Sequence, residues 1–313
     1  MMIIGIFSKI DHSVILRRNS VRRISYEITD TVPFFLQNYE PSSRFLKSYY
    51  SRYPDIFAEY FSYHCKDTED RHQQFIEKYP KAIPRIEQVH HKILPIIKET
   101  ADLYTKKYQV TFPIEVNLIV GGFGSNAYTH RQIIPNITFA LEKLSPRQDH
   151  LRTIAAHEFG HVTHNTLSHE AGTDWEKIDW YSPLIWLLQE GAAIHLSRQI
   201  VTDLTPSMYF SFDDEGKDWL TFSESNTDKI KAAFAWDITN KSTHYVYREW
   251  FSINGGERYG YSRLGYYLAD LFFQSLIRDG GEQQAMIAWK NREYEKKAKE
   301  WLFLNTAPSF FLK

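Results

Sequence analysis

His157-Glu158-Phe159-Gly160-His161 forms a His-Glu-x-x-His pattern near the middle of this chain of 313 residues. If the segment is helical, one turn separates the two imidazoles, and their Cβ atoms lie about 5–6 Å apart on one face. Two ring nitrogens can then bind one zinc ion at about 2.0–2.1 Å each. Glu158 points toward the open coordination position of that ion, where it can take a proton from a metal-bound water.

The residues around this pattern predict a helix that begins near residue 145. Ser145 suits the N-cap position and Pro146 suits the first helical position. A buried stripe at helical spacing is formed by Leu151, Ile154, Ala155 and Val162. Asn165 and the Ser/Thr-rich segment after it predict where the helix ends.

A zinc site of this type needs a third protein ligand. One arrangement places a further His ten positions after the first, but Leu167 occupies that position here, so we exclude it. His164 lies on the same helix, and three ligands along one straight helix would span about 10 Å at 1.5 Å per residue. One ion cannot bind ligands so far apart, and we interpret His164 as a surface residue, with the alternative that it lies behind a ligand and supports it.

Glu190 is the best candidate for the third ligand. Ser182-Pro183 predicts the start of another helix, and an apolar run over residues 184–196 surrounds Glu190. A carboxylate inside such a helix is costly to bury unless it is paired or bound to a metal. Two His and one Glu form a known catalytic zinc set. The alternative is that Glu190 lies on a solvated edge or pairs with an Arg such as Arg198.

The two motifs together resemble the gluzincin clan of zinc metallopeptidases. The second motif is Leu188-Gln189-Glu190-Gly191-Ala192-Ala193, and the 29 positions from residue 161 to residue 190 exceed the spacing in thermolysin-like and aminopeptidase members. The chain is more similar to a bacterial family of predicted zinc-dependent proteases of unknown function. The resemblance covers roughly residues 110–290. It implies an α+β, zincin-like fold that is mostly helical, with a small mixed sheet before the metal-binding helix, and one Zn²⁺ per chain.

The resemblance also implies a role for Tyr266. That family tends to carry a Gly-Tyr-x-x-Gly-like element, which is matched here by Gly265-Tyr266-Tyr267-Leu268-Ala269 with Ala in place of the second Gly. A donor beside the metal stabilises the tetrahedral oxyanion of peptide hydrolysis. Tyr261 is the second choice for this donor, and Arg263 and His244 are further options. The alternative is a Tyr266 that serves packing alone, because the chain has 20 Tyr.

A small sheet is predicted before the His motif. Residues 114–120 alternate and are rich in β-branched side chains, and residues 127–129 and 133–140 predict the next strands. The glycine-rich segment 121–126 is a turn signal. In gluzincins an edge strand lies along the cleft, so we expect backbone near Gly124–Tyr128 to line a groove for an extended peptide. A plain turn between two strands is the alternative.

The N-terminal third of the chain predicts helices. Asp67–Tyr79 and Pro84–Tyr108 are expected as separate helices, because Pro80 and Pro84 break helices and Pro95 kinks the second one. We interpret four His of this part as surface or core residues and not as ligands, namely His64, His72, His90 and His91. The chain divides into a mainly helical region, 1–110, and a catalytic region, 111–313.

Composition excludes several classes of protein. The net charge of −1 gives no electrostatic case for nucleic acid or an anionic membrane, and the basic cluster Arg17–Arg23 is typical of a solvated face. The single Cys65 excludes an internal disulfide. The apolar run Met1–Phe7 is too short for a secretory core, and no later stretch is long enough for a membrane helix. We expect a cytoplasmic protein, with no prediction of its oligomeric state.

These observations predict a zinc-dependent peptidase that acts on a peptide or protein substrate. His157, His161 and Glu190 bind Zn²⁺, and Glu158 is the general base for the metal-activated water and then protonates the leaving amine. Two alternatives stay open: a catalytically inactive zincin-fold protein with a binding or regulatory role, and a zinc hydrolase of a non-peptide amide or ester. The presence of Glu158 argues against an inactive protein.

Overall fold

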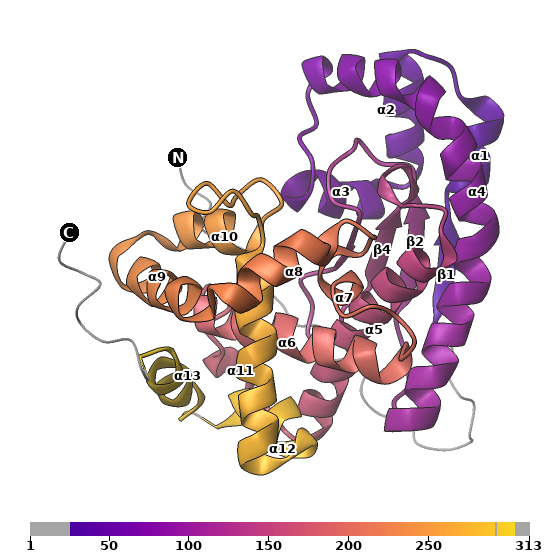
Figure 1. The fold of residues 1–313 in the computed structure, drawn as a ribbon. Coiled ribbons are helices and arrows are strands. Elements are labelled where there is room, and N and C mark those ends of the chain that lie inside the picture. Colours follow the sequence, from indigo (N-terminus) through magenta and orange to yellow (C-terminus); the bar gives the residue numbers. More distant parts are fainter. Residues whose placement is uncertain (1–25, 292, 304–313) are drawn as a thin grey trace.

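The computed structural model describes residues 26–291 and 293–303 (Figure 1). Most of these residues are helical, and four short strands form one mixed sheet. The predicted α+β class, mostly helical with a small mixed sheet, is therefore confirmed, whereas its zincin-like character stays a prediction. The apolar run Met1–Phe7 and the basic cluster Arg17–Arg23 lie outside the described residues.

The sheet combines strands from both ends of the first half of the chain. Its strands are β1 (Glu27–Asp30), β2 (Glu115–Ile119), β3 (Ala127–Thr129) and β4 (Ile137–Ala140), in the order β1-β2-β4-β3. β1, β2 and β4 are parallel, and β3 pairs antiparallel with β4 at the edge. The division of the chain at residue 110 stays a prediction, with the qualification that β1, from the first region, belongs to this sheet.

The N-terminal helices pack together above the sheet. They are α1 (Val32–Asn38), α2 (Ser43–Arg52), α3 (Pro54–Tyr63) and α4 (Glu69–Tyr108). Buried aromatic rings fill the space between them, among them Phe35, Tyr49, Tyr60, Phe75 and Tyr79. In Figure 1 these helices lie at the upper right, and α4 runs down the side of the molecule.

The helix α4 is continuous over 40 residues, so the predicted break at Pro80 and Pro84 was wrong. Its three prolines all lie on the exposed side, while an unbroken apolar face is buried from Phe75 to Tyr104. The carbonyl of Ile76, which Pro80 deprives of its helical N–H, accepts a hydrogen bond from the Tyr39 hydroxyl at 3.3 Å. Packing of the apolar face therefore outweighs the cost of the prolines.

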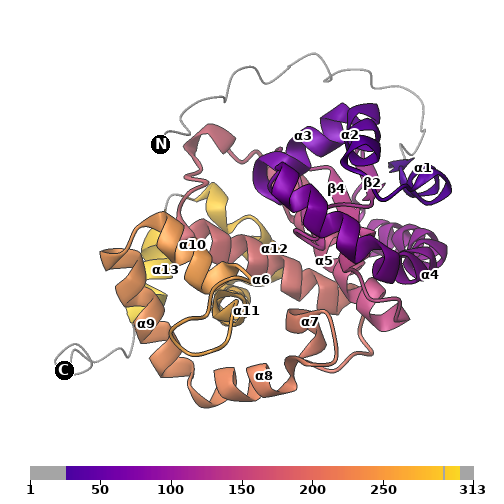
Figure 2. The same ribbon diagram turned by 90° about the horizontal axis from the view of Figure 1, so that it is seen from above.

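The C-terminal part is built around two adjacent helices. These are α5 (Gln148–Glu170), which carries the His motif, and α6 (Pro183–Ile200), which carries Glu190. The remaining helices are α7 (Met208–Ser211), α8 (Gly216–Ser225), α9 (Thr227–Asn240), α10 (Thr243–Phe251), α11 (Leu264–Gly280), α12 (Glu282–Met286) and α13 (Tyr294–Phe303). Figure 2 shows α5 and α6 between the N-terminal helices α1–α3 and the helices α8–α10.

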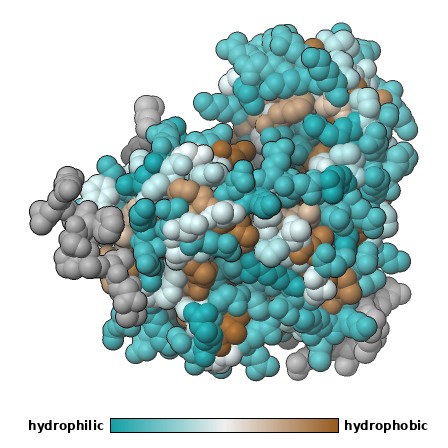
Figure 3. Space-filling model, viewed as in Figure 1, coloured by the Kyte–Doolittle hydropathy of each residue, from teal (hydrophilic) through white to brown (hydrophobic). Residues whose placement is uncertain are grey.

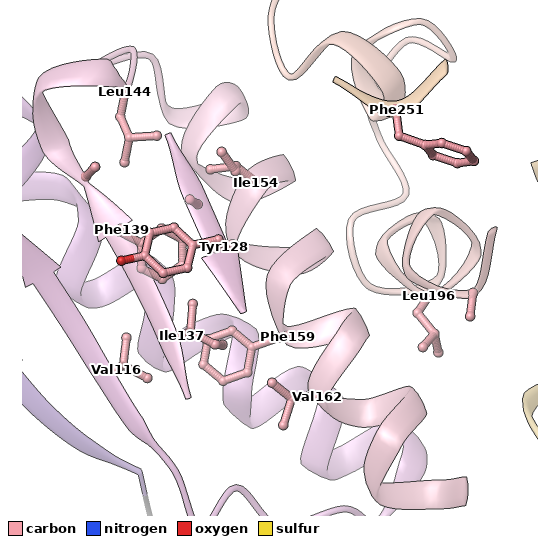
Figure 4. Packing of buried hydrophobic residues seen from close by; sticks show 14 of the residues in the cluster. Val116, Tyr128, Ile137, Phe139, Leu144, Ile154, Phe159, Val162, Leu196 and Phe251 are labelled. Carbon is pink, nitrogen blue, oxygen red and sulfur yellow. The ribbon is translucent and has the colours of Figure 1, made fainter. Parts of the chain in front are cut away.

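Buried side chains surround α5 on nearly every side. Figure 4 shows the side chains that lie between the sheet and this helix: Val116, Ile137 and Phe139 from the strands, and Ile154, Phe159 and Val162 from α5. The helices α4 and α6 cover its other sides, and α11 packs on α6. Such a helix is part of the core and not an amphipathic surface helix.

The predicted ends of α5 differ from the observed ones. Its N-cap is Arg147, and Ser145 accepts a hydrogen bond from the Arg147 amide at 3.3 Å instead of capping the helix. The helix continues past Asn165, whose amide donates to the Ile133 carbonyl at 2.9 Å. Because this tertiary partner satisfies the Asn side chain, Asn165 does not compete with the helix backbone and does not end the helix.

Two glycines permit close helix packing at the centre of the molecule. A Cβ atom on Gly160 of α5 would lie 3.1 Å from the Cα of Ala193 on α6. A Cβ atom on Gly191 of α6 would lie 2.3 Å from the carbonyl oxygen of Ala269 on α11. The backbones of the three helices therefore approach each other at positions where a larger side chain would separate them.

The surface seen in Figure 3 is mainly hydrophilic, with hydrophobic residues in separate patches. Within the described part of the chain, we find no helix that combines the length and the apolar character needed to cross a bilayer.

The four His of the N-terminal third contact other groups and not the two motif His residues. His72 Nε2 lies 2.7 Å from Asp67, His90 Nε2 lies 2.6 Å from Asp30, and His91 is exposed. The ring of His64 stacks on Tyr128 with 3.5 Å between centroids.

Burial holds two His beside the sheet in the neutral form. His64 Nδ1 lies 3.1 Å from the Ser125 hydroxyl, and His130 Nε2 lies 2.7 Å from the Thr138 hydroxyl. Burial lowers the pKa of His64 to about 3, with a further contribution from Arg131, and burial lowers the pKa of His130 to about 4. Both values are well below the ordinary His pKa of 6.5.

These pKa values predict a loss of stability in acid. As the pH falls below 6.5 toward 4, the unfolded chain binds protons at these positions that the folded chain does not, so the free energy of unfolding falls. His64→Phe keeps a ring against Tyr128 but removes one titrating group. As the pH falls, the free energy of unfolding of His64→Phe should therefore decrease less steeply than that of the parent protein. The two slopes should differ by up to about 1.4 kcal/mol per pH unit.

Urea midpoints near pH 7, 6 and 5, measured with a metal chelator present, test this expectation. His91→Phe, at an exposed position of α4, is the control and should keep the slope of the parent protein. Equal slopes for His64→Phe and the parent would contradict the assignment.

Candidate metal centre

Three side chains from α5 and α6 converge on one point. His157 Nε2 lies 3.1 Å from His161 Nε2 and 3.3 Å from Glu190 Oε2, and His161 Nε2 lies 3.7 Å from that oxygen. Ligand atoms of a tetrahedral zinc bound at about 2.0–2.1 Å lie about 3.3–3.4 Å from one another. The three separations therefore match those of three ligands around one ion. Among the described residues this is the one such group of His, Cys, Asp and Glu side chains.

The backbone of each helix determines this geometry. One turn of α5 separates the two His rings, whose centroids lie 4.7 Å apart with their planes at 88°. The close approach of α5 and α6 at Gly160 and Ala193 positions the helix turn that carries Glu190 opposite these rings. The long spacing between the two motifs is occupied by the end of α5 and the connection to α6, and it does not change the geometry of the site.

No Lys or Arg of the described residues pairs with the carboxylate of Glu190, whose hydrogen-bond partners are His157 and the Tyr266 hydroxyl. The Oε2 atom of Glu190 is buried, and the side chain is only 19% exposed. Arg198, the alternative partner, pairs with Asp270 at 2.6 Å instead. A buried carboxylate oxygen that faces two ring nitrogens is stabilised by a bound cation. The two nitrogens and one oxygen are donors that zinc prefers, so the residues fit this metal.

The charge states of these groups also suit metal binding. Burial lowers the pKa of His161 to about 4, so its ring is neutral and its nitrogen is free to coordinate. Burial alone would raise the pKa of Glu190, but His161 and His157 outweigh this effect and hold the pKa below its ordinary value. Glu190 is therefore a carboxylate at neutral pH.

Glu158 has a different charge balance from Glu190. Its side chain is buried, and burial raises its pKa to about 7, while His157 opposes this shift and the negative charge of Glu190 adds to it. A carboxyl group with a pKa near neutrality can both accept and release a proton.

Tyr266 lies against the candidate ligands. Its ring is nearly parallel to that of His157, with 6.2 Å between centroids. Burial and the negative charge of Glu190 hold the pKa of Tyr266 well above its ordinary value, so the hydroxyl keeps its proton and can donate it in a hydrogen bond. Tyr261, the second choice, stacks instead on Phe222 at 4.7 Å.

Phe212 also contacts the site, which we did not predict from the sequence. Its ring lies 5.0 Å from that of His157, in the connection between α7 and α8. His157 Nδ1 is buried and has no hydrogen-bond partner in the part of the chain described, so the ring is held in place by Phe212 and Tyr266. No sequence signal identifies Phe212, because its position depends on a loop conformation with a φ of 61°.

The interpretation of His164 as a surface residue was wrong. This side chain is fully buried and stacks on Trp289 with 4.3 Å between ring centroids. Burial lowers the pKa of His164 to about 3, so the ring packs as a neutral aromatic group. It is not a member of the ligand group formed by His157, His161 and Glu190.

Comparisons with models of protein families, with curated proteins and with solved structures found no match to this chain.

The geometry of the site predicts about one zinc per chain, with Glu190 as a ligand. Glu190→Ala should lower zinc affinity by a factor of about 100 or more, because it removes one of three protein ligands. Zinc content after purification, and competition with a chelator of known affinity, measure this effect. Glu170→Ala, an exposed change at the end of α5, is the matched control. Unchanged affinity in Glu190→Ala would show that another group is the third ligand.

Proposed function

We propose that this protein is a zinc-dependent peptidase. The observation that carries the proposal is the convergence of His157 Nε2, His161 Nε2 and Glu190 Oε2 at the separations expected of three zinc ligands, with the Glu158 carboxyl next to them. A zinc ion held by these three residues would supply Lewis acidity, which polarises a carbonyl group and makes a water molecule more acidic.

Glu158 is the proton carrier in this proposal. It accepts a proton from the attacking water and then delivers it to the amine that leaves. Its burial beside the candidate ligands and its pKa of about 7 support both steps, because neither protonation state is strongly disfavoured near neutral pH.

Tyr266 stabilises the oxyanion that forms when water adds to the peptide carbonyl. Its nearly parallel packing on His157 and its protonated hydroxyl support this role. The Tyr266 hydroxyl also hydrogen-bonds the carboxylate of Glu190, which keeps this donor beside the candidate ligands.

The sheet edge next to α5 supports a peptide as substrate. Residues 126 and 130 exchange backbone hydrogen bonds with β4 and its flanking residues: Ala140 N donates to Asn126 O, and His130 N donates to Asn136 O. In an antiparallel pair, hydrogen-bonded and non-hydrogen-bonded positions alternate. The backbone groups of Ala127 and Thr129 therefore point away from β4. The Ala127 amide is bonded by the Asn126 side chain at 2.9 Å. The other outward groups are available to an extended peptide.

The glycine-rich turn before β3 is held in place by hydrogen bonds from its backbone amides. The amides of Gly121 and Phe123 donate to the carboxylate of Glu142 at 2.8 and 3.0 Å. The amides of Gly122 and Gly124 donate to the Tyr60 hydroxyl at 2.7 and 3.1 Å. Because these four amides are already bonded, we place the substrate groove at β3 and not on the turn itself.

These arguments also bear on the alternatives. An inactive binding protein would have no need for the buried carboxyl of Glu158 beside the candidate ligands. A non-peptide ester offers no backbone N–H groups to the β3 edge, so a peptide fits this surface better. A cytoplasmic location stays an expectation from the sequence.

Removing the general base should abolish most of the activity. Glu158→Gln should reduce peptide hydrolysis by a factor on the order of 10² or more and retain zinc, because the proton acceptor is lost and the ligands are not. A peptide-library digest read by mass spectrometry identifies cleavable peptides, and their cleavage rates and the zinc content are then compared. Undiminished hydrolysis in a zinc-loaded Glu158→Gln protein would falsify the assigned role.

Removing the Tyr266 hydroxyl should slow turnover without a loss of metal. Tyr266→Phe keeps the packing on His157, and we expect kcat to fall by about 10- to 1,000-fold at unchanged zinc occupancy. Tyr261→Phe is the matched control, since that ring packs on Phe222. If Tyr261→Phe is slow and Tyr266→Phe is not, the donor has been assigned to the wrong residue.

A further inference from the structure

The side chain of Arg263 packs on two aromatic rings that themselves contact the candidate ligand His157. Its guanidinium carbon is 5.5 Å from the ring centroid of Tyr266 and 5.6 Å from that of Phe212. Both rings in turn contact the ring of His157. The positive charge of Arg263 therefore lies next to the aromatic rings that pack on the candidate ligand His157.

No carboxylate partner of this cation is found in the part of the chain that the structure describes. In the described residues, no Asp or Glu oxygen lies within 4.0 Å of the Arg263 guanidinium, although the side chain is half-buried. By contrast, Arg198 pairs with Asp270 and Arg258 pairs with Asp237. Contact with two aromatic faces offsets part of the cost of desolvating Arg263, but it leaves the hydrogen-bonding edge of the guanidinium free.

The backbone holds Arg263 in an unfavourable conformation. Its φ of 60° and ψ of 28° lie in the left-handed region, and it is the N-cap of α11. Only four described non-glycine residues have a positive φ, and Phe212, which contacts Arg263, is another of them. The indole of Trp219 donates to the Ser262 carbonyl at 2.8 Å and fixes the chain just before Arg263. Strained residues of this kind cluster at functional sites.

We propose that Arg263 binds a carboxylate of the substrate, so that the enzyme prefers peptides with a negative charge close to the cleaved bond. This inference rests on the proposed peptidase function and names its substrate class. A guanidinium binds a carboxylate through two parallel hydrogen bonds, which fixes the position as well as the charge of its partner. The carboxylate is either the C-terminus of the peptide or an acidic side chain, since both present the same group.

The experiment compares four forms of one cleavable peptide. The first has a free C-terminus just beyond the cleaved bond, and the second is its amide. The third is an amide with Glu next to the cleaved bond, and the fourth has Gln in place of that Glu. Cleavage is measured with zinc-loaded parent protein, Arg263→Gln and Arg263→Lys. Arg52→Gln is the matched control, because Arg52 also stacks on a ring, that of Phe34, but lies on α2 away from the site.

The parent and Arg52→Gln should cleave one charged form about 10- to 100-fold more efficiently, in kcat/KM, than its neutral counterpart. The first pair of peptides reports a C-terminal carboxylate, and the second pair reports an acidic side chain. Arg263→Gln should lower this ratio to about 1, because only the charged peptide of each pair has a carboxylate for Arg263 to bind. Arg263→Lys should restore part of the ratio, since it keeps the charge but not the two-pronged geometry.

Binding to the Glu158→Gln protein gives a readout that does not depend on turnover. Calorimetric titration with the same peptides should show the same preference for a charged form, and the double variant with Arg263→Gln should lose it. If no peptide is cleaved, the proposed function fails and the binding comparison alone decides the role of Arg263. Equal binding of charged and neutral forms, or an equal loss of cleavage for all four peptides in Arg263→Gln, overturns the inference.

Discussion

The contact between α5 and α6 at Gly160 and Ala193 is the constraint on which the site depends. Each helix alone presents ordinary side chains, two His on one and a Glu on the other, and only the distance between the helix axes makes them a set of ligands. The 3.1 Å space above Gly160 admits no added Cβ without displacement of the α6 backbone. Because metal–ligand distances tolerate changes of only about 0.2 Å, even a small displacement of this backbone would disturb the position of Glu190 Oε2 relative to the two imidazoles.

The same packing gives two carboxyl groups different charge balances. Glu158 and Glu190 are both buried beside His157. Glu190 faces both imidazoles and stays ionised, whereas burial dominates at Glu158 and brings its pKa to about 7. Pairs of carboxyl groups whose environments separate their pKa values are typical of sites that hold a cation with one group and move a proton with the other. Tyr266 and Phe212 close this arrangement by packing on the His157 ring.

The parts of the structure that were predictable follow local rules. The helices that carry His157 and Glu190 were predicted from capping residues and apolar spacing, and the sheet before them from alternation. The errors arose where distant contacts decide. Pro80 does not break α4, because the apolar face of that helix is buried along its length and Tyr39 satisfies the freed carbonyl. β1 is four residues long and partly exposed, so its sequence has no buried run to mark it. His164 is buried, and the ring that stacks on it, Trp289, lies more than a hundred residues later in the chain.

The order of strands in the sheet has a consequence for how the chain is made. β1 lies between residues 27 and 30, and its parallel partner β2 lies between residues 115 and 119. During synthesis β1 has no strand to pair with until some 85 further residues have been added, and the long α4 must form in between. Pairings at such sequence separation are slow because a large loop must close first. β1 therefore stays unpaired during synthesis while the helices after it, whose hydrogen bonds are local, can already form.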